Sequence, residues 1–498
     1  MSQTIQESYE EVAYPGFIYP QAHPDRLAVM AKFFGLNSPS IENCRVLELG
    51  CGDGTALISF AYSLPQSKFV GIDIAANHIE QGNKTIRAVG MNNIELKQFD
   101  VMNIDESFGE FDYIIAHGLI SWVPDFVREK VFEICSKNLS SNGVVYLSYN
   151  TMPGCHLRKI AREMMLYHTR KVTNSQLKAK EGLSMIKFFS ENVDEPEVYK
   201  MILQNEFDSL SDVNLANIVH DDFSEINHPF YFHEFMREAD NQGLQFLAEA
   251  DYIDMQDYYL KDPFRAMLYQ LRNDVIEREQ YLDFARGRRF RQTLLCRKDI
   301  QLNRTQTPQV VRKFYVASSA KAESENPDLS GDTAERFVGS KTEEITSNNP
   351  LVKSALYVLG KAFPESLGFD ELLDSARVVL GKNENETKER DAIELSSLLL
   401  QIYRSALIEF HLFKPVFTLE PCEKPNANPI ARHQSKIFNI VSSLRGDSCF
   451  LSEKTTVDVL QLLDGTRTPN EIQNELGINA DEFGKAFELL KQNALIER

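Results

Sequence analysis

The sequence predicts an α/β protein built around a largely parallel β-sheet and followed by helix-rich units. Between residues 45 and 150, apolar runs alternate with helical patterns such as VREKVFEICSKNL, which is typical of parallel strands joined by crossover helices. A cluster of glycines ends the first run, where the chain turns from a buried strand into a helix. The five predicted strands are RVLEL (45–49), FVGID (69–73), IELKQFD (94–100), FDYIIA (111–116) and GVVYLSY (143–149).

The same sheet is expected to resume further along the chain. After Cys155 the alternation gives way to a long helical pattern that includes HLRKIAREMMLYHTRK. FHEFMREADNQG then predicts an amphipathic helix ending at Gly243, while LQFLAEAD and RFRQTLLCRK predict two more strands. We therefore interpret residues 155–230 and 252–288 as insertions into one sheet domain.

The C-terminal third of the chain is predicted to form two smaller units. A polar stretch over residues 317–344 marks a boundary, and the flanking segments FYVAS and ERFVGS are expected to pair as strands. A helical block follows, and Thr468, Pro469 and Glu471 then form a capping-box signature in a last unit of winged-helix type. The predicted segments are 1–154 (N-terminal arm and ligand-binding core), 155–230 (helical insertion), 231–316 (completion of the core sheet with a second insertion), 317–422 (α-rich) and 423–498 (winged-helix-like).

Charge and cysteine content restrict the partners and the compartment. The formal net charge of −19 argues against nucleic acid as a ligand and favours basic partners such as lysine-rich polypeptides. Seven cysteines without a CxxC pair indicate free thiols in a reducing environment. Neither a signal sequence nor an apolar run of membrane-spanning length is recognisable. A cytoplasmic protein without membrane insertion is the expectation.

The turn ELGCGDG is suited to a polar ligand that approaches the backbone. Gly50, Gly52 and Gly54 leave room for backbone N–H groups and a helix N-terminus to reach such a ligand. Asp73 ends the next strand and can accept both hydroxyls of a ribose, and Asp100 ends the third strand, where it can meet an adenine amino group. The alternative is a tight turn with capping carboxylates and no ligand, although all these groups fall on one sheet edge.

The sequence resembles the class I S-adenosylmethionine-dependent methyltransferases that carry a methyltransferase regulatory domain, including the rickettsial outer-membrane-protein lysine methyltransferases. The resemblance covers nearly the whole chain, and HGLISWVP, SYNTMPG and HPFYFHEF are specific to that family. It implies a Rossmann-like class I sheet, the regulatory domain within residues 231–316, and S-adenosylmethionine as cofactor. The matching stretches are YPQAHPDRLA (19–28), RVLELGCGDG (45–54), FVGIDI (69–74), HGLISWVP (117–124), SYNTMPG (148–154), HPFYFHEF (228–235), LQFLAEA (244–250), FRQTLLC (290–296) and LLDGTRT (462–468).

Residues at the carboxyl ends of the predicted strands and in the N-terminal arm are expected to bind this cofactor. Arg26 is a candidate partner for the cofactor carboxylate, with simple packing of the arm as the alternative. Both insertions leave the sheet from the ligand edge and are expected to roof the site. The expected cofactor-binding residues are Tyr19, Arg26, Glu48, Gly50, Cys51, Gly52, Gly54, Asp73, Ile74, Asp100, Val101 and His117.

Methyl transfer requires an aligned acceptor that loses a proton, so polar groups are expected near the reacting methyl. His117, Tyr149 and Asn150 come from the ends of the fourth and fifth strands, and His220 and Asp221 come from the roof. A base or a loop-ordering hydrogen bond is equally compatible with His117. The cluster IVHDDFSEINHPFYFHEF has the residue types of a metal site but lacks a paired-histidine helix motif, so we expect an acceptor-facing polar rim and no metal.

The resemblance makes protein lysine the first choice of acceptor. A small molecule or lipid is the enzymatic alternative, and a cofactor-binding interaction module without turnover is the non-enzymatic one. The helical insertion 155–230 is expected to select the acceptor or to form a homodimer. The single tryptophan, Trp122, is interpreted as packing and not as part of a cage around a methylated ammonium.

Overall fold

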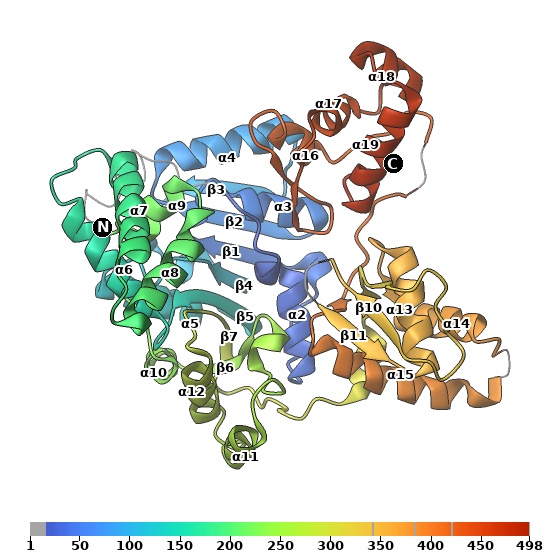
Figure 1. Ribbon diagram of the computed structural model, residues 1–498, viewed down its shortest axis with the longest axis horizontal. Helices are drawn as coiled ribbons and strands as arrows, with labels where there is room; N and C mark the ends of the chain where they lie inside the picture. The colour runs from blue at the N-terminus through green and yellow to red at the C-terminus, as the bar shows by residue number, and fades with distance from the viewer. Residues whose placement is uncertain (1–15, 341–342, 383–384, 420–421, 498) are drawn as a thin grey trace.

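The computed structural model describes residues 16–340, 343–382, 385–419 and 422–497. A seven-stranded sheet in the order β3-β2-β1-β4-β5-β7-β6 forms its centre (Figure 1). All pairs from β3 to β5 are parallel, and β7 runs antiparallel to both β5 and β6. The predicted α/β fold class and all seven predicted strands are confirmed. The strands are β1 (Arg45–Leu49), β2 (Lys68–Asp73), β3 (Ile94–Gln98), β4 (Phe111–Ala116), β5 (Leu139–Asn150), β6 (Leu244–Glu249) and β7 (Phe290–Arg297).

Helices with one apolar face cover this sheet. In α10 (Phe232–Asn241) the buried residues are Phe232, Phe235, Met236 and Ala239, which recur at the three- and four-residue spacing of a helix face. Gly243 follows with φ +74°, as expected for the residue that terminates the helix. The other core helices are α2 (Pro24–Phe33), α3 (Thr55–Ser63), α4 (Ala76–Val89) and α5 (Asp125–Lys137), with short 3₁₀ turns η1 (Pro20–Ala22), η2 (Ile41–Asn43), η3 (Val101–Asn103) and η4 (Glu106–Phe108).

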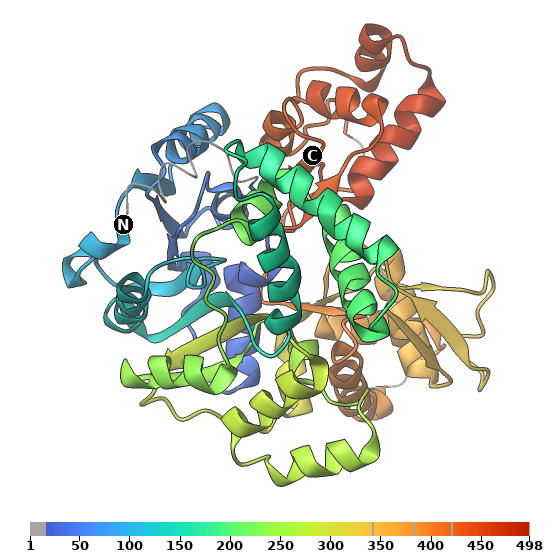
Figure 2. The same ribbon diagram turned by 60° about the vertical axis from the view of Figure 1, so that its left-hand side comes forward.

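Two helical insertions interrupt the sheet between its last strands. Four helices follow β5 and gather around a small apolar core of their own; they appear in green in Figures 1 and 2. The chain returns to the sheet where Thr151 and Phe230 form a parallel bridge. The first insertion contains α6 (Cys155–His168), α7 (Ser175–Asn192), α8 (Glu197–Ser211) and α9 (Leu215–Asp222), and the second contains η5 (Tyr252–Met255), α11 (Asp262–Gln270) and α12 (Val275–Arg286).

The segment after the core combines helices with two small sheets, and one predicted pairing is wrong. FYVAS forms β8 (Tyr315–Ala317), which pairs with β12 (Leu367–Gly368) and β13 (Glu409–His411). ERFVGS forms β10 (Glu335–Val338), which pairs with β9 (Lys321–Ala322) and β11 (Glu344–Ser347). The partners of β8 come from further along the chain, so proximity in sequence suggested the wrong neighbour. The unit also contains η6 (Pro308–Lys313), α13 (Pro350–Ala362), α14 (Phe369–Val379), η7 (Asn385–Thr387) and α15 (Lys388–Tyr403).

The last unit is helical and contains a short hairpin after its first helix. Thr468 and Glu471 form the predicted capping box at the start of α18, with Pro469 as the first helical residue. An apolar cluster separate from the main core holds this unit together. Among the described residues, no helix is both long and apolar enough to span a membrane. The elements are α16 (Pro429–Gln434), β14 (Ile440–Ser442), β15 (Ser448–Phe450), α17 (Lys454–Leu462), α18 (Pro469–Leu476) and α19 (Ala480–Gln492).

Helix α2 joins the core to the later units. It lies between the seven-stranded sheet and helices α13–α15 (Figure 1). The Asp25 carboxylate accepts a 2.6 Å hydrogen bond from the backbone N–H of Leu412 and lies 2.8 Å from Nδ1 of His411. Arg26 forms a 2.9 Å ion pair with Glu409. The first helix of the core is therefore fixed by residues at and beyond β13.

Candidate functional site

The glycine turn after β1 has the backbone conformation that its sequence requires. Gly50, Gly52 and Gly54 have φ values of +71°, +56° and +71°, in the left-handed region that favours glycine. The N–H groups of Gly50 and Cys51 donate to the carbonyl of Ile72 in β2. Within 4 Å, a Cβ added to Gly52 would meet no atom of the described residues other than its chain neighbours. The backbone at Gly52 therefore borders open space that a ligand can enter.

Asp73 holds this turn in place. One carboxylate oxygen accepts a hydrogen bond of 2.9 Å from the N–H of Gly52, and the other accepts one of 2.8 Å from the N–H of Ala75. Carboxylate oxygens have further lone pairs, so these bonds leave capacity for hydroxyl groups of a ligand. The sequence predicted a ribose-binding role for Asp73, and the structure adds a role in fixing the glycine turn.

A cavity of about 460 Å³ lies at the carboxyl ends of β1, β2, β4 and β5. Its size is typical of cofactor and small-molecule sites, which span roughly 300 to 1,000 Å³. Its wall combines the core, the start of β7 and the first insertion. The sequence-predicted residues that line it are Tyr19, Glu48, Gly50, Cys51, Gly52, Asp73, Ile74, Val101, His117, Asn150, His220 and Asp221.

Glu48 is a buried titratable group at the cofactor end of the cavity. Its side chain is buried, and among the described residues its Oε2 has no hydrogen-bond partner. Burial, with smaller contributions from Asp53 and Asp73, raises the pKa of Glu48 to about 8. A buried carboxyl group without a partner is costly in the free protein, and a cationic ligand would relieve that cost.

His117 is held rigidly at the end of β4. Its ring stacks on Tyr19 with a centroid distance of 3.5 Å, and its Nδ1 lies 2.8 Å from the hydroxyl of Tyr146. Burial lowers the pKa of His117 to about 3. An imidazole with this pKa is neutral at physiological pH and is a weak proton acceptor. This geometry favours the loop-ordering interpretation of His117 over a general base.

The far end of the cavity is formed by the first insertion and β7. Arg158 donates two hydrogen bonds of 2.9 Å to Asp222, and Arg289 is paired with Glu206 at 2.5 Å. Both guanidinium groups are therefore neutralised by carboxylates. Asp221 also lines the cavity, and burial raises its pKa to about 6. No hydrogen bond or ion pair to another described residue fixes its carboxylate.

Four predicted site residues lie outside the cavity lining. Arg26 pairs with Glu409 of β13, and we correct its assignment to the cofactor carboxylate accordingly. Tyr149 points away from the cavity, because alternate residues of β5 face opposite sides, and its hydroxyl lies 3.0 Å from Oγ1 of Thr293. Asp100 caps η3 by accepting from Met102, although its neighbours Phe99 and Val101 line the cavity. Gly54 forms the N-cap of α3.

Several lining residues were not predicted from the sequence. Gly16 and Phe17 close the cavity from the N-terminal side, and a Cβ added to Gly16 would come within 2.4 Å of Thr55. Phe290 and Gln292 enter from the start of β7. The alternation along RFRQT could have indicated them, since this strand was placed in the sheet. In the described part of the chain, no cluster of three or more His, Cys, Asp or Glu side chains could hold a metal.

Two protein families match adjoining parts of this chain. Residues 40–217 match a family described as a methyltransferase domain, and residues 214–297 match a predicted methyltransferase regulatory domain. Uncharacterized protein RP789 of Rickettsia prowazekii is 36% identical over 437 residues, which make up 86% of this chain and 78% of the relative. Uncharacterized protein RP028 of the same organism is 35% identical over 50% of this chain and 99% of its own length.

The fold and the site define a class I S-adenosylmethionine-dependent methyltransferase. The chain belongs to the methyltransferases that carry a methyltransferase regulatory domain. It is similar in structure to PKMT2 from Rickettsia typhi, with 28% sequence identity, a TM-score of 0.87 and coverage of 97% of this chain and 100% of PKMT2. The structure of PKMT2 in complex with AdoHcy aligns with a TM-score of 0.88 and 27% identity.

The residues of the cavity fit S-adenosylmethionine. The Glu48 oxygen that has no hydrogen-bond partner in the described part of the chain suits a cationic group such as the ammonium of the cofactor. The open space beside Gly52 suits a ligand that contacts backbone, and Asp73 retains acceptor capacity for ribose hydroxyls. These three groups come from β1, the glycine turn and β2, so the core alone supplies them.

Proposed function

We propose that this enzyme transfers a methyl group to lysine side chains of a protein and that Asp221 receives the acceptor amine. The observation that carries this proposal is the charge at the far end of the cavity. Both arginines there are neutralised by Asp222 and Glu206, whereas the carboxylate of Asp221 has no hydrogen bond or ion pair to another residue that the structure describes. A cationic acceptor is therefore favoured, and an anionic one is not.

The chemistry assigns distinct tasks to the residues of the cavity. S-adenosylmethionine supplies an electrophilic methyl group when bound. The lysine nitrogen forms a bond to that carbon as the bond to sulfur breaks, so the amine must first lose a proton. Asp221 can accept this proton because its raised pKa of about 6 brings it closer to the pKa of a desolvated amine. Neutral His117 and the side chain of Asn150 position the reacting groups.

Three observations support a protein as the acceptor. The net charge of −19 favours basic polypeptide partners. The chain is similar over nearly its whole length to PKMT2 from Rickettsia typhi, and its sequence resembles the rickettsial outer-membrane-protein lysine methyltransferases. The cavity is lined at the acceptor end by His220, Asp221 and Arg158 of the first insertion. We propose that this insertion selects the acceptor, and a role in a homodimer stays an untested alternative. The free state of all seven cysteines supports a reducing, cytoplasmic location.

The test combines acceptor discovery with a matched pair of variants. Cell-lysate proteins are incubated with enzyme and isotope-labelled S-adenosylmethionine, and mass spectrometry is expected to locate the label on lysine. Asp221→Asn should lower kcat by about 10²-fold, the usual size of a proton-acceptor contribution. Asp212→Asn, an exposed residue of the same insertion, should behave like the parent. Parent-like turnover by the Asp221 variant, or label only on small molecules, would contradict the proposal.

A further inference from the structure

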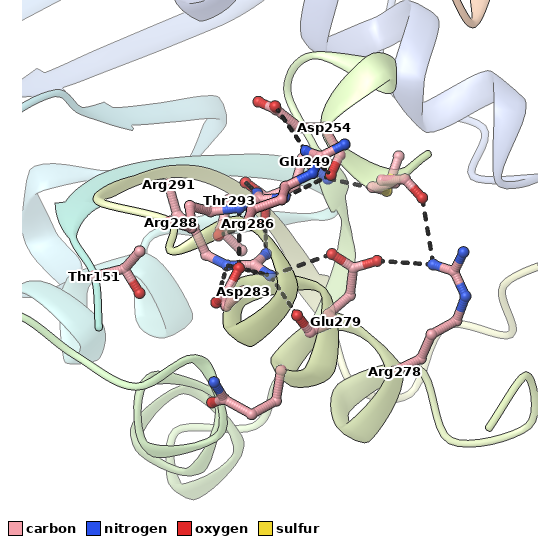
Figure 3. A network of polar contacts seen from close by, with 12 residues as sticks. Thr151, Glu249, Asp254, Arg278, Glu279, Asp283, Arg286, Arg288, Arg291 and Thr293 are labelled. Carbon is pink, nitrogen blue, oxygen red and sulfur yellow. Dashed lines mark hydrogen bonds and ion pairs between the residues drawn. The ribbon is translucent and has the colours of Figure 1, made fainter. Parts of the chain in front are cut away.

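A network of charged side chains lies fully buried beneath β5, β6 and β7 (Figure 3). At its centre is Arg291, whose side chain is 0% exposed. Arg291 contacts three carboxylates, with distances of 2.5 Å to Glu249, 2.8 Å to Asp283 and 3.2 Å to Glu279. Glu249 belongs to β6, and the other two come from α12 of the second insertion. The network therefore links that insertion to the core sheet.

The strand pattern places this network directly behind the acceptor end of the cavity. Phe290 and Gln292 line the cavity, so Arg291 between them points to the opposite face of β7. On the neighbouring strand, Asn150 lines the cavity and Tyr149 points to that same opposite face. Strands β5 and β7 thus form a wall of the cavity with one face and contact the network with the other.

Glu249 connects the network to both strands. Its carboxylate accepts a hydrogen bond of 3.1 Å from the backbone N–H of Gln292 and one of 2.8 Å from the hydroxyl of Thr293. The Thr293 hydroxyl also lies 3.0 Å from that of Tyr149 on β5. A single carboxylate thereby fixes β7 at Gln292 and, through one hydroxyl, the end of β5 next to Asn150.

Stability alone is a weak explanation for so many buried charges. Removing ionised groups from water is costly, and well-packed apolar residues often replace buried ion pairs without loss of stability. Hydrogen-bonded charges, however, fix geometry more sharply than apolar contacts do. The acceptor wall needs such precision, because misplacing reacting groups by about 1 Å can cost about 10²-fold in rate.

We propose that Glu249 is a positioning residue for methyl transfer, which sets the places of Asn150 and Gln292 on the acceptor wall. The inference rests on the proposed function in that it takes this end of the cavity to be the acceptor end. Glu249, Glu279, Asp283 and Arg291 all lie within residues 214–297, the segment that matches the regulatory domain. This network is accordingly the physical link through which that segment acts on the acceptor.

The kinetic test compares two carboxylates of the same network. Glu249→Gln and Glu279→Gln each remove one charge beside Arg291, but only Glu249 also accepts a hydrogen bond from the backbone N–H of Gln292. With poly-L-lysine as acceptor and labelled S-adenosylmethionine, the Glu249 variant should lose about tenfold or more in kcat/KM for the acceptor. Its affinity for S-adenosylhomocysteine, measured by calorimetry, should match the parent. The Glu279 variant, compared with a Glu249 variant of equal thermal stability, should retain both the kcat/KM for the acceptor and the affinity for S-adenosylhomocysteine.

A second measurement works without any acceptor. Amide hydrogen exchange at Gln292 and Asn150 should become faster in the Glu249 variant and stay unchanged in the Glu279 variant. Thr293→Val keeps every charge and removes only the hydroxyl between Tyr149 and Glu249, so it should accelerate exchange at Asn150. If both glutamine variants lose kcat/KM equally, and the loss follows their loss of thermal stability, the network has only a structural role. If amide exchange changes in the variants as expected but the parent enzyme transfers no methyl group to poly-L-lysine, the result would instead count against lysine as the acceptor.

Discussion

Replacing Glu48 by glutamine should stabilise the free enzyme at alkaline pH and leave it almost unchanged near pH 5. The raised pKa means that the native protein keeps a proton on Glu48 that the unfolded chain releases above pH 4.5, so stability falls as pH rises toward about 8. Each pKa unit corresponds to about 1.4 kcal/mol, so the displacement from 4.5 to about 8 corresponds to roughly 5 kcal/mol at most. Glutamine carries no charge at any pH and avoids this penalty.

Urea unfolding of the cofactor-free protein at several pH values tests this reasoning. The single tryptophan, Trp122, lines the cavity and provides a fluorescence signal from the core. The free-energy difference between Glu48→Gln and parent should grow from near zero at pH 5 to several kcal/mol at pH 9. Glu42→Gln, an exposed residue, should show no such trend. S-adenosylhomocysteine should bind the Glu48 variant more weakly. A stability difference that is the same at both pH values would refute the argument.

Three further predictions concern the turn and the interdomain contact. Asp73→Ala removes the carboxylate expected to accept the ribose hydroxyls, together with its bonds to the N–H groups of Gly52 and Ala75. The loss of one charge-assisted hydrogen bond to the ribose, worth about 1.5 kcal/mol, should weaken cofactor binding about tenfold by calorimetry. Gly52→Val should abolish cofactor binding, whereas Gly90→Val, with a similar φ but at the exposed end of α4, should only reduce stability. Burial alone would lower the pKa of His411, but its hydrogen bond to Asp25 helps to raise it overall. The stabilisation from His411 is therefore complete below pH 6.5 and lost as pH rises through the raised pKa, and His411→Gln should remove this pH dependence of thermal unfolding.

Most residues that line the cofactor end of the cavity could be located from the sequence because their determinants are local. The glycine turn, Glu48 and Asp73 follow from strand ends that the apolar runs mark clearly, and parallel strands bring their carboxyl ends to one edge. Arg26 and Tyr149 were placed wrongly because their partners, Glu409 and Thr293, are remote in sequence.

The acceptor end was predictable only in part. Asp221 was chosen from its residue type, and the structure places it in the cavity wall. Its distinction from Asp222 could not be read from the sequence, because pairing with Arg158 depends on how α6 and α9 pack. Periodicity indicates which face of an element is buried, but it does not indicate which charged side chains meet.

The bonds of α2 to β13 also bear on how the chain matures during translation. Asp25 emerges from the ribosome 386 residues before its partner His411. At about 5 to 20 residues per second, the ribosome needs about 20 to 80 s to add that length. Throughout this interval, Asp25 and Arg26 lack the groups that later neutralise them, so α2 cannot complete its native packing. The ribosome therefore completes synthesis of the sheet domain long before α2 can reach its native packing. A nascent chain halted after β7 should remain sensitive to protease at α2.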